Sequence, residues 1–340
     1  MRESRRSLMR VLVLHSDVPA DARPDELDTL VQAEAVAAAL AEKGHHAERA
    51  AFAVTTLRET LAQARPDIVF NLVESVEGDG SRAPLAPEML AGLALSFTGN
   101  ASEPMTKTGD KPLVKRIFRD AGHPTPDWSE PPHWHALADH CRYVVKSATE
   151  DASLGLDDEA VVIGGEAIRA RAQACAERYG GRWFAEEYIE GREFNVAVLE
   201  EYGEPRVLPI AEMRFEQWAP SRPRIVGYGA KWDLESPDAV NTVRVFGWDE
   251  AEPELNARLS HLAREAWRLF GLSGYARVDF RVSERGDATM LEVNPNPCIA
   301  PDAGFAAAAA QAGYTYADMV EKILASARKV SGEGLGDVLA

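Results

Sequence analysis

Cysteine is scarce in this chain. The 340 residues contain three cysteines, Cys141, Cys175 and Cys298, and no two of them form a C-x-x-C pair. A disulfide framework or a structural zinc site needs cysteines at closer and more regular spacing, so the sequence excludes both. Free thiols persist in reducing compartments, and we therefore expect a cytoplasmic protein.

Long hydrophobic runs are also missing. The first ten residues are basic, but the apolar run after them covers only residues 11–14. A signal sequence or a membrane span needs a longer apolar segment. The sequence therefore predicts no membrane partner, and residues 11–15 are expected to form the first strand of a globular protein.

An excess of positive charge is lacking as well. Lysine and arginine number 37 against 54 aspartates and glutamates, which gives a net charge of -17. Nucleic acids and anionic membranes bind basic surfaces, so neither is an expected partner. An anionic nucleotide stays compatible with this charge, because the lysines and metal ions at a site matter more than the total.

The first hundred residues alternate between strand and helix patterns. Strands are predicted over 11–15, 47–52 and 68–72, with helices over 27–43 and 55–64 between them. This order is typical of a parallel sheet that binds ligands at the carboxyl ends of its strands. Three acidic residues follow the third strand, and they either line that crevice or are solvated loop charges: Glu74, Glu77 and Asp79.

Further elements follow after a helix over 111–121 that Asp110 can cap. The patterns predict strands over 143–146, 160–163, 183–189, 194–199 and 206–215, and helices over 166–179, 253–270, 305–312 and 316–329. The chain is thus predicted to belong to the α/β class, in part α+β, with two or three domains.

Residues 275–297 predict a β-hairpin, since two alternating apolar runs flank a Ser-Glu-Arg-Gly-Asp turn. Arg277 and Asp279 share one face of the first strand, and Glu292 and Asn294 share one face of the second. Together these groups are costly to bury without a ligand, and magnesium prefers such oxygens. From the spacing alone, a magnesium site and a solvated hairpin are equally good interpretations.

Three lysines are candidate phosphate ligands. Lys111 begins a helix, Lys146 ends an apolar strand and Lys231 precedes Trp232. Each lysine alone is typical of a protein surface. Together with a metal-binding hairpin, they would supply the cations that a triphosphate needs.

Several motifs now stand in a recognisable order. They are Phe70-Asn71-Leu72-Val73, Asp110-Lys111, Tyr143-Val144-Val145-Lys146, the Glu186 to Leu199 segment, Ala230-Lys231 and the Arg277 to Asn294 hairpin. From Val11 to about Leu324 the chain resembles the ATP-grasp superfamily and, within it, the D-alanine:D-alanine ligases. The resemblance implies an ATP-grasp fold with an N-terminal parallel-sheet domain over 1–103, a central subdomain over 104–190 and a catalytic domain over 191–340.

The resemblance also implies a role for each matching residue. Lys111 and Lys146 would hold the α- and β-phosphates of ATP, and Lys231 the γ-phosphate. Adenine and ribose would be bound by Glu186, the backbone of Glu187 and Ile189, and Glu193. Two Mg²⁺ ions, or Mn²⁺ in their place, would be held by Asp279, Glu292 and Asn294. Arg277 would stabilise the transferred phosphoryl group.

The implied reaction joins two small molecules, a carboxylate and an amine. The carboxylate attacks the γ-phosphate to give an acyl phosphate and ADP, and the amine then displaces phosphate. Such phosphoryl transfer needs positioning and charge neutralisation, and no side-chain nucleophile. The resemblance also suggests a homodimer formed through the first unit.

The substrate half departs from the family. Ser16 to Asp21 replaces a glycine-rich segment, Glu74 a histidine and Trp232 a tyrosine, while Pro295-Asn296-Pro297-Cys298 replaces Thr-x-Pro-Gly. The site for the second substrate thus lacks the hydroxyl and the glycine that the family has there. Their loss argues against D-alanine as the second substrate. We expect a ligase for another amino acid, peptide or amine. A true D-alanine:D-alanine ligase and a non-catalytic ATP-binding regulator are the alternatives.

Candidate substrate contacts lie within or beside these departures. They are His15, Glu74, Trp232 and Asn296. His15 ends the first predicted strand, where a lone histidine is equally compatible with a purely structural role. The acidic residues after the third strand favour a cationic or amine-bearing substrate.

Overall fold

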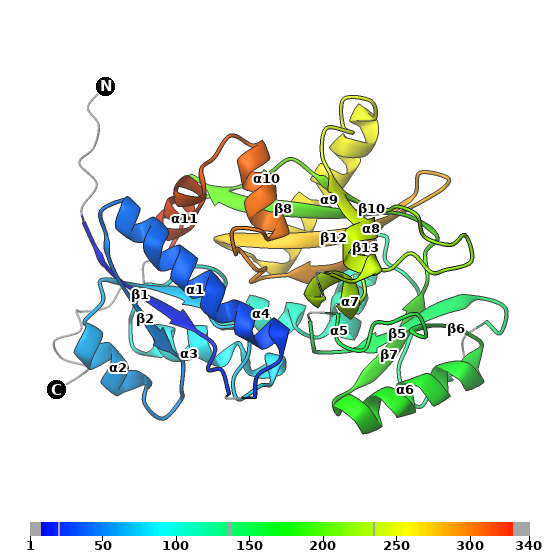
Figure 1. The fold of residues 1–340 in the computed structure, drawn as a ribbon, viewed down its shortest axis with the longest axis horizontal. Coiled ribbons are helices and arrows are strands. Elements are labelled where there is room, and N and C mark those ends of the chain that lie inside the picture. Colours follow the sequence, from blue (N-terminus) through cyan, green and yellow to red (C-terminus); the bar gives the residue numbers. More distant parts are fainter. Residues whose placement is uncertain (1–7, 20, 135–137, 152, 234, 329–340) are drawn as a thin grey trace.

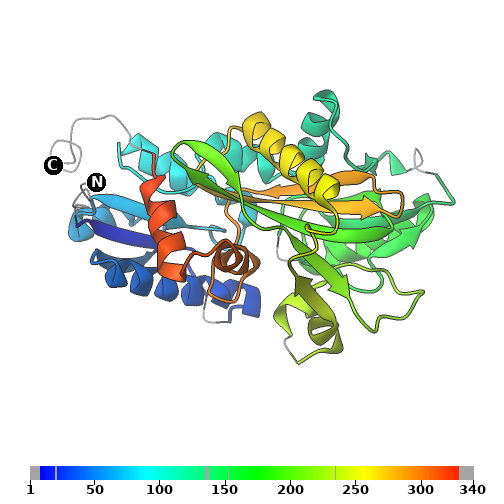
Figure 2. The same ribbon diagram turned by 90° about the horizontal axis from the view of Figure 1, so that it is seen from above.

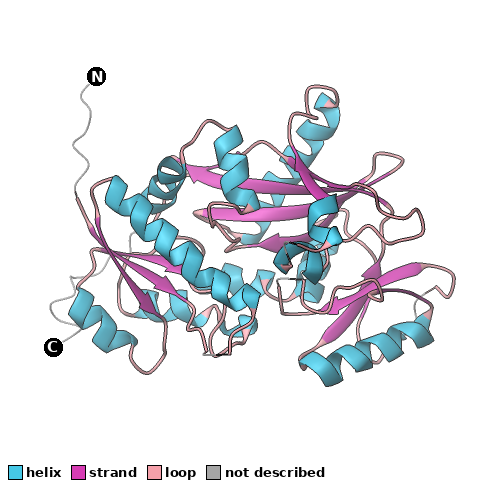
Figure 3. Cartoon of the chain, viewed as in Figure 1, coloured by secondary structure: helices cyan, strands magenta, loops and turns pink. Residues whose placement is uncertain are grey.

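A computed structural model gives the arrangement of the chain. It describes all residues except 1–7, 20, 135–137, 152, 234 and 329–340. Three sheets follow one another along the sequence, and Figures 1 and 3 show them as separate layers with helices packed against them. Among the described residues, no helix is both long and apolar enough to span a membrane.

The first sheet is parallel, as predicted. It contains β1 (Arg10–His15), β2 (His46–Ala51) and β3 (Ile68–Leu72) in the order β2-β1-β3, with α1 (Pro24–Glu42) and α2 (Leu57–Ala64) as the connections. Successive side chains of a strand point to opposite faces. Accordingly, Val11 and Val13 pack toward α1, whereas Leu12 and Leu14 pack toward α2. Both faces of this sheet are therefore buried.

The second sheet is antiparallel and has α6 (Gly165–Tyr179) against it. Its strands are β4 (Trp128–Ser129), β5 (Arg142–Ser147), β6 (Val161–Ile163) and β7 (Trp183–Glu187), in the order β4-β7-β5-β6. The buried side of α6 carries Ile168, Ala172 and Cys175 at three- and four-residue spacing. This spacing places them on one helix face.

The third sheet carries the hairpin predicted from the sequence. Its strands are β8 (Gly191–Glu201), β9 (Glu204–Val207), β10 (Ala211–Phe215), β11 (Thr242–Val245), β12 (Tyr275–Ser283) and β13 (Ala288–Asn294). The order is β11-β10-β8-β12-β13, with β9 paired to β8. The long strand predicted over 206–215 is thus two strands. Figure 2 shows α9 (Pro253–Phe270) lying across this sheet.

The helix α5 (Lys111–Asp120) also packs on the third sheet, through Val114 and Phe118. Shorter elements complete the fold: η1 (Gly80–Arg82), α3 (Leu85–Gly92), α4 (Ser102–Thr108), α7 (Tyr228–Trp232) and α8 (Pro237–Asn241). The sequence patterns did not predict α3. Pro87 lies in the first turn of α3, where a proline is tolerated because its missing N–H group has no partner within the helix.

The last two helices return to the first sheet. Both α10 (Gly304–Gln311) and α11 (Tyr316–Ala325) share a core with β1, β3 and α1. Lys43 pairs with Asp318 at 2.6 Å, and the buried His45 contacts Glu321 at 2.9 Å. The last helix was predicted to run to residue 329, but it ends at Ala325, so the prediction is wrong over residues 326–328, and residue 329 lies outside the described residues. The three-domain division stays a prediction, since the first core contains residues from both ends of the chain.

Candidate active site

The β12–β13 hairpin forms and brings the predicted polar residues together. Asp279 lies opposite Glu292, and Arg277 lies opposite Asn294. The Asp279 carboxylate accepts two 2.8 Å hydrogen bonds from the Arg277 guanidinium, which hold both groups in place. Amide nitrogens of Asn195 and Asn294 also donate to Asp279, at 2.9 and 3.2 Å. The two polar faces therefore coincide.

Glu292 lies at the centre of a cluster of cations. Burial alone would raise the pKa of this carboxyl, but Lys111, Lys146, Lys231 and Arg277 hold the pKa far below its usual range. Three of these four cations also pair with another carboxylate: Lys111 with Asp151, Lys146 with Glu186 and Arg277 with Asp279. A polyphosphate would bring several negative charges to these cations, and metal ions would neutralise the carboxylates beside it.

The donor set of the hairpin suits a hard cation. Asp279 and Glu292 offer carboxylate oxygens and Asn294 offers an amide oxygen, which are the ligands that magnesium prefers. The described part of the chain holds no group of three histidine, cysteine, aspartate or glutamate residues that could bind a metal ion by themselves.

Lys111 lies at the first turn of α5 and reaches the loop after β5. Its ammonium donates to the Glu150 carbonyl at 2.9 Å and to the Asp151 carboxylate at 2.7 Å. Burial lowers the pKa of Lys111, yet the charges of Asp151 and Glu292 more than offset this effect and raise it. Lys111 thus stays charged and ties the loop to the cation cluster.

Glu186 lies between two lysines. Its carboxylate contacts Lys146 at 2.5 Å and pairs also with Lys115. Lys115, which sequence reasoning missed, follows Lys111 by four residues and so lies on the same face of α5. Its ammonium also donates to the Leu291 carbonyl at 3.1 Å, beside Glu292. The Glu186 carboxylate therefore orients Lys146 as well as facing the cavity.

Arg281 is a second residue that sequence reasoning missed. Its guanidinium donates to the carbonyls of Ile189, Gly191 and Arg224 at 2.8–3.1 Å, and to Glu193 at 3.2 Å. Arg281 follows Arg277 and Asp279 at two-residue spacing, so the alternation in the sequence already placed it on the polar face. It joins the β7–β8 turn to the loop before α7.

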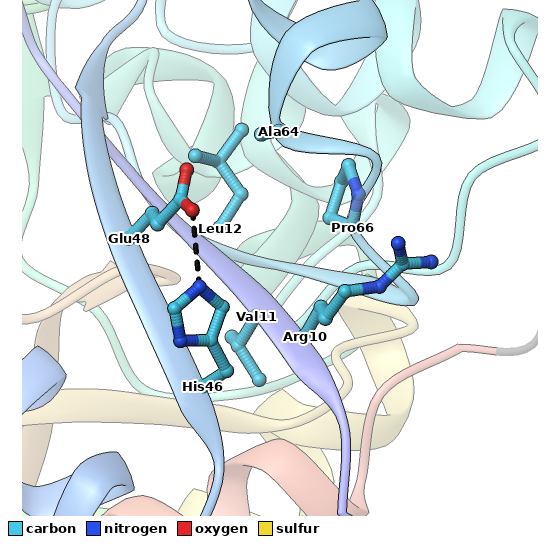
Figure 4. A pocket seen from close by; sticks show the side chains of 7 residues that line it. All are labelled: Arg10, Val11, Leu12, His46, Glu48, Ala64 and Pro66. Atoms are coloured by element: carbon cyan, nitrogen blue, oxygen red, sulfur yellow. Dashed lines mark hydrogen bonds and ion pairs between the residues drawn. The ribbon is translucent and has the colours of Figure 1, made fainter.

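One cavity of about 980 Å³ connects these groups. That volume lies at the upper end of the range for small-molecule sites and accommodates a nucleotide together with a substrate. The predicted nucleotide and metal residues all line it: Lys111, Lys146, Glu186, Glu187, Ile189, Glu193, Lys231, Arg277, Asp279, Glu292 and Asn294. Figure 4 shows a second depression, between β1, β2 and the end of α2, whose volume of about 10 Å³ is too small for such ligands.

The predicted substrate contacts divide into two groups. Glu74, Trp232 and Asn296 line the cavity, whereas His15 is not one of its lining residues and its ring lies 2.8 Å from the Ser16 carbonyl. Of the acidic residues after β3, only Glu74 lines the cavity. Glu77 instead pairs with Arg82, and Asp79 accepts from the Ser81 backbone, so these two act as loop residues.

Asp28 of α1 also lines the substrate end of the cavity, and no sequence pattern indicated it. Its carboxylate lies 3.0 Å from the Cys298 thiol, and burial raises its pKa. The Gln32 side chain, one helical turn after Asp28 on α1, donates a 2.9 Å hydrogen bond to the Glu74 carboxylate. The wall formed by α1 and the end of β3 is therefore acidic.

Comparison with known proteins agrees with this geometry. The family model for the D-Ala D-Ala ligase C-terminus matches residues 136–325. The protein y4sG of Sinorhizobium fredii, described as uncharacterised, is 31% identical over 313 residues, 89% of each chain. The D-alanine–D-alanine ligase of Moorella thermoacetica is 28% identical over 312 residues, 87% of this chain and 93% of that one.

A solved structure supports the fold. The D-alanine–D-alanine ligase from Bacillus anthracis in complex with ATP superposes with a TM-score of 0.73 at 19% identity, covering 94% of this chain and 97% of that one. The fold and the family match define an ATP-grasp carbon–nitrogen ligase. The chain belongs to the D-alanine–D-alanine ligase family.

Proposed function

We propose that the protein joins a small-molecule carboxylate to an amine, with ATP as the energy source and an acyl phosphate as the intermediate. The observation that carries this proposal is the cluster of four cations around Glu292, beside the oxygens of Asp279 and Asn294. A triphosphate with divalent metal ions matches both the charge and the donor atoms of that cluster.

The nucleotide binds in the part of the cavity that lies between the second and third sheets. Lys111 and Lys146 bind the α- and β-phosphates, and Lys231 the γ-phosphate. Glu186, the backbone of Glu187 and Ile189, and Glu193 bind adenine and ribose. All of these residues line one cavity, which supports the assignment.

Asp279, Glu292 and Asn294 would hold two Mg²⁺ ions, which would neutralise phosphate charge when bound. The Asn195 amide and the Arg277 guanidinium already fix the Asp279 carboxylate, so this ligand is preorganised. Manganese, whose ligand preference is similar, would substitute for magnesium.

The chemistry proceeds in two transfers. An oxygen of the substrate carboxylate bonds to the γ-phosphorus while the bond to the ADP oxygen breaks, and Lys231 and Arg277 stabilise the charge that develops. The ammonium group of the amine substrate first loses a proton to solvent. The neutral nitrogen then bonds to the acyl carbon while the bond from that carbon to the phosphate oxygen breaks, and the second proton passes to the departing phosphate or to solvent. The protein supplies orientation and charge, and no side chain becomes covalently modified.

The amine substrate carries positive charge. Asp28 and Glu74 line the substrate end, and the buried hydroxyl of their neighbour Thr29 has no hydrogen-bond partner among the described residues. An ammonium group would pair with these carboxylates. The amine substrate is therefore an amino acid, a peptide or a small amine, and the departure from the family at residues 295–298 argues against D-alanine. Assembly as a homodimer stays a prediction.

A true D-alanine–D-alanine ligase is the second candidate, favoured by the names of the relatives. ADP release from ATP and Mg²⁺, measured with pairs drawn from D- and L-amino acids, dipeptides and amines, separates the two. We expect an amide product by mass spectrometry with at least one pair other than two D-alanines. Product from D-alanine alone would establish the second candidate, and ATP binding without turnover of any pair would indicate a non-catalytic regulator.

A further inference from the structure

Lys111 already has an anionic partner in the structure. Its ammonium group donates to the Asp151 carboxylate at 2.7 Å and to the Glu150 carbonyl at 2.9 Å. The Lys111 side chain is 7% exposed, whereas that of Asp151 is 62% exposed. A buried lysine is thus paired with a carboxylate that solvent can reach, and both residues line the cavity.

The backbone next to Asp151 holds this carboxylate at the lysine. The Ser147 hydroxyl, at the end of β5, accepts from the Glu150 N–H at 3.0 Å. The Ala148 carbonyl accepts from the Lys111 N–H at 2.9 Å, which joins the same loop to the first residue of α5. The contact between Asp151 and Lys111 therefore belongs to a loop whose backbone is anchored on α5.

The charge of Asp151 also reaches another cation of the cavity. Burial lowers the pKa of Arg277, but three carboxylates more than offset this effect and raise it: those of Asp279, Glu292 and Asp151. The first two belong to the β12–β13 hairpin, whereas Asp151 belongs to the β5–β6 connection. Asp151 thus adds a negative charge to the cation cluster from outside the hairpin.

The proposed function assigns Lys111 to a phosphate of ATP. A carboxylate that stays on the same ammonium group would repel the phosphate oxygens, because like charges at close range disfavour each other. The loop that carries Asp151 brings this carboxylate to the position at Lys111 that a phosphate oxygen would take. The Asp151 carboxylate and a nucleotide phosphate therefore compete for Lys111.

We infer that Asp151 is an internal competitor of the triphosphate, whose carboxylate must leave Lys111 when ATP binds. The contact is autoinhibitory, since a nucleotide binds with full affinity only to the fraction of molecules in which Lys111 is released. The inference rests on the proposed ATP site. It adds a residue that raises the ATP concentration needed for half-saturation.

A role as a metal ligand makes a different prediction for Asp151. A carboxylate that coordinates Mg²⁺ beside the phosphates strengthens nucleotide binding, and only when the metal is present. A competitor weakens the binding of phosphate-bearing ligands with the metal and without it. A residue that only anchors the loop affects adenosine and its phosphates alike. Binding of these ligands with Mg²⁺ and with EDTA therefore distinguishes the three roles.

The test uses the full-length protein and the variants Asp151→Asn, Asp151→Glu and Glu159→Gln. Glu159 is the matched control, because it lies in the same β5–β6 connection and pairs with Arg171 at 3.2 Å. Its side chain is 84% exposed, and it is not one of the residues that line the cavity. Calorimetry measures the Kd of adenosine, of ADP and of a non-hydrolysable ATP analogue, each with Mg²⁺ and with EDTA.

We expect Asp151→Asn to lower the Kd of ADP and of the analogue about 5-fold, the upper end for an ion pair with one exposed partner. The decrease should occur with Mg²⁺ and with EDTA, and the Kd of adenosine should stay unchanged. Asp151→Glu keeps the charge, so it should bind all three ligands like the unmodified protein. Glu159→Gln removes the same charge elsewhere in the connection and should also leave every Kd unchanged.

The outcomes separate this inference from the proposed function. If Asp151→Asn binds the analogue no more tightly than the unmodified protein, the competing role of Asp151 is wrong and the ligase function stands. Weaker binding with Mg²⁺ alone would identify a metal ligand, and equal changes for adenosine and the analogue would identify a structural role. Tighter nucleotide binding by Asp151→Asn, with no ADP release from any substrate pair, would support the role of Asp151 and overturn the ligase function.

Discussion

The ammonium group of Lys115 and the carboxylate of Glu186 form an ion pair closed to solvent. The Lys115 side chain has no exposed surface, and that of Glu186 is 3% exposed. Burial lowers the pKa of Lys115 to about 8 in spite of the nearby carboxylate. Pairs of this kind are costly to break, because the remaining charge stays buried.

We predict that Lys115→Met lowers the free energy of unfolding by about 3 kcal/mol, the low end for a broken buried pair, since Lys146 still contacts Glu186. Urea denaturation measures this change. Lys107→Met is the matched control, because Lys107 pairs with Glu103 on the surface and such pairs contribute about 0.5 kcal/mol. Equal costs for the two variants would show that burial of the Lys115 pair has no special effect.

The contacts of Arg281 predict a nucleotide-binding effect. The Arg281 side chain is 4% exposed, and its guanidinium donates hydrogen bonds to Glu193 and to the carbonyls of the β7–β8 turn. Arg281→Met should raise the KM for ATP about 10-fold to 100-fold, as expected for a lost hydrogen bond to a charged group, with a smaller change in kcat. Initial rates at varied ATP test this, and Arg281→Lys should recover part of the loss. An unchanged KM, equal to that of Arg285→Met in the exposed hairpin turn, would contradict it.

The position of Glu292 predicts a metal-dependent effect. Glu292→Gln keeps the size of the side chain but removes the charge at the centre of the cation cluster. Metal stabilisation of a transition state amounts to several kcal/mol, so kcat/KM should fall at least about 100-fold and the half-saturating Mg²⁺ concentration should rise. Magnesium titrations of the rate provide the measurement. Glu284→Gln, in the turn of the same hairpin, should behave like the unmodified protein.

Glu201 predicts a pH-dependent contribution to stability. Burial raises the pKa of this carboxyl, but hydrogen bonds from Arg206, Lys322 and Tyr314 lower it from 4.5 to about 2. A carboxyl whose pKa is lower in the folded state stabilises above its unfolded pKa, and this stabilisation is lost as the pH falls from about 4.5 to 2.

The variant Glu201→Gln should therefore be less stable than the unmodified protein by about 2 to 3 kcal/mol near neutral pH, and the difference should shrink below pH 4.5. Urea midpoints at several pH values measure it. Glu204→Gln, at the exposed start of β9, serves as the control. If the stability difference between the two proteins stays constant with pH, the charge of Glu201 is not the source of the stabilisation.

The sequence predicted the hairpin because its signal is local. Two-residue alternation in residues 275–297 sets which side chains share a face. The pairing of Asp279 with Glu292 also needs the register shift between Asp279 and Phe280, which alternation does not predict. The same alternation extended to Arg281, and helical spacing linked Lys115 to Lys111. The positions of Arg281 and Lys115 in the site were therefore predictable in principle, although isolated charged residues usually lie on the surface.

Other parts of the site carry no local signal. Asp28 and Cys298 are 270 positions apart, and only the packing of α1 against the loop between β13 and α10 brings them to 3.0 Å. Tertiary relationships of this kind do not follow from periodicity or propensity.

The return of α10 and α11 to the first sheet has a consequence for synthesis on the ribosome. The core around Val13 and Phe70 also needs Phe305 and Ile323, which emerge much later. At about 5 to 20 residues per second, the roughly 250 intervening residues take some 10 to 50 s to make. During that interval one face of β1 and β3 lacks the helices α10 and α11. The nascent chain would therefore be an expected client of chaperones until its C-terminal helices are released.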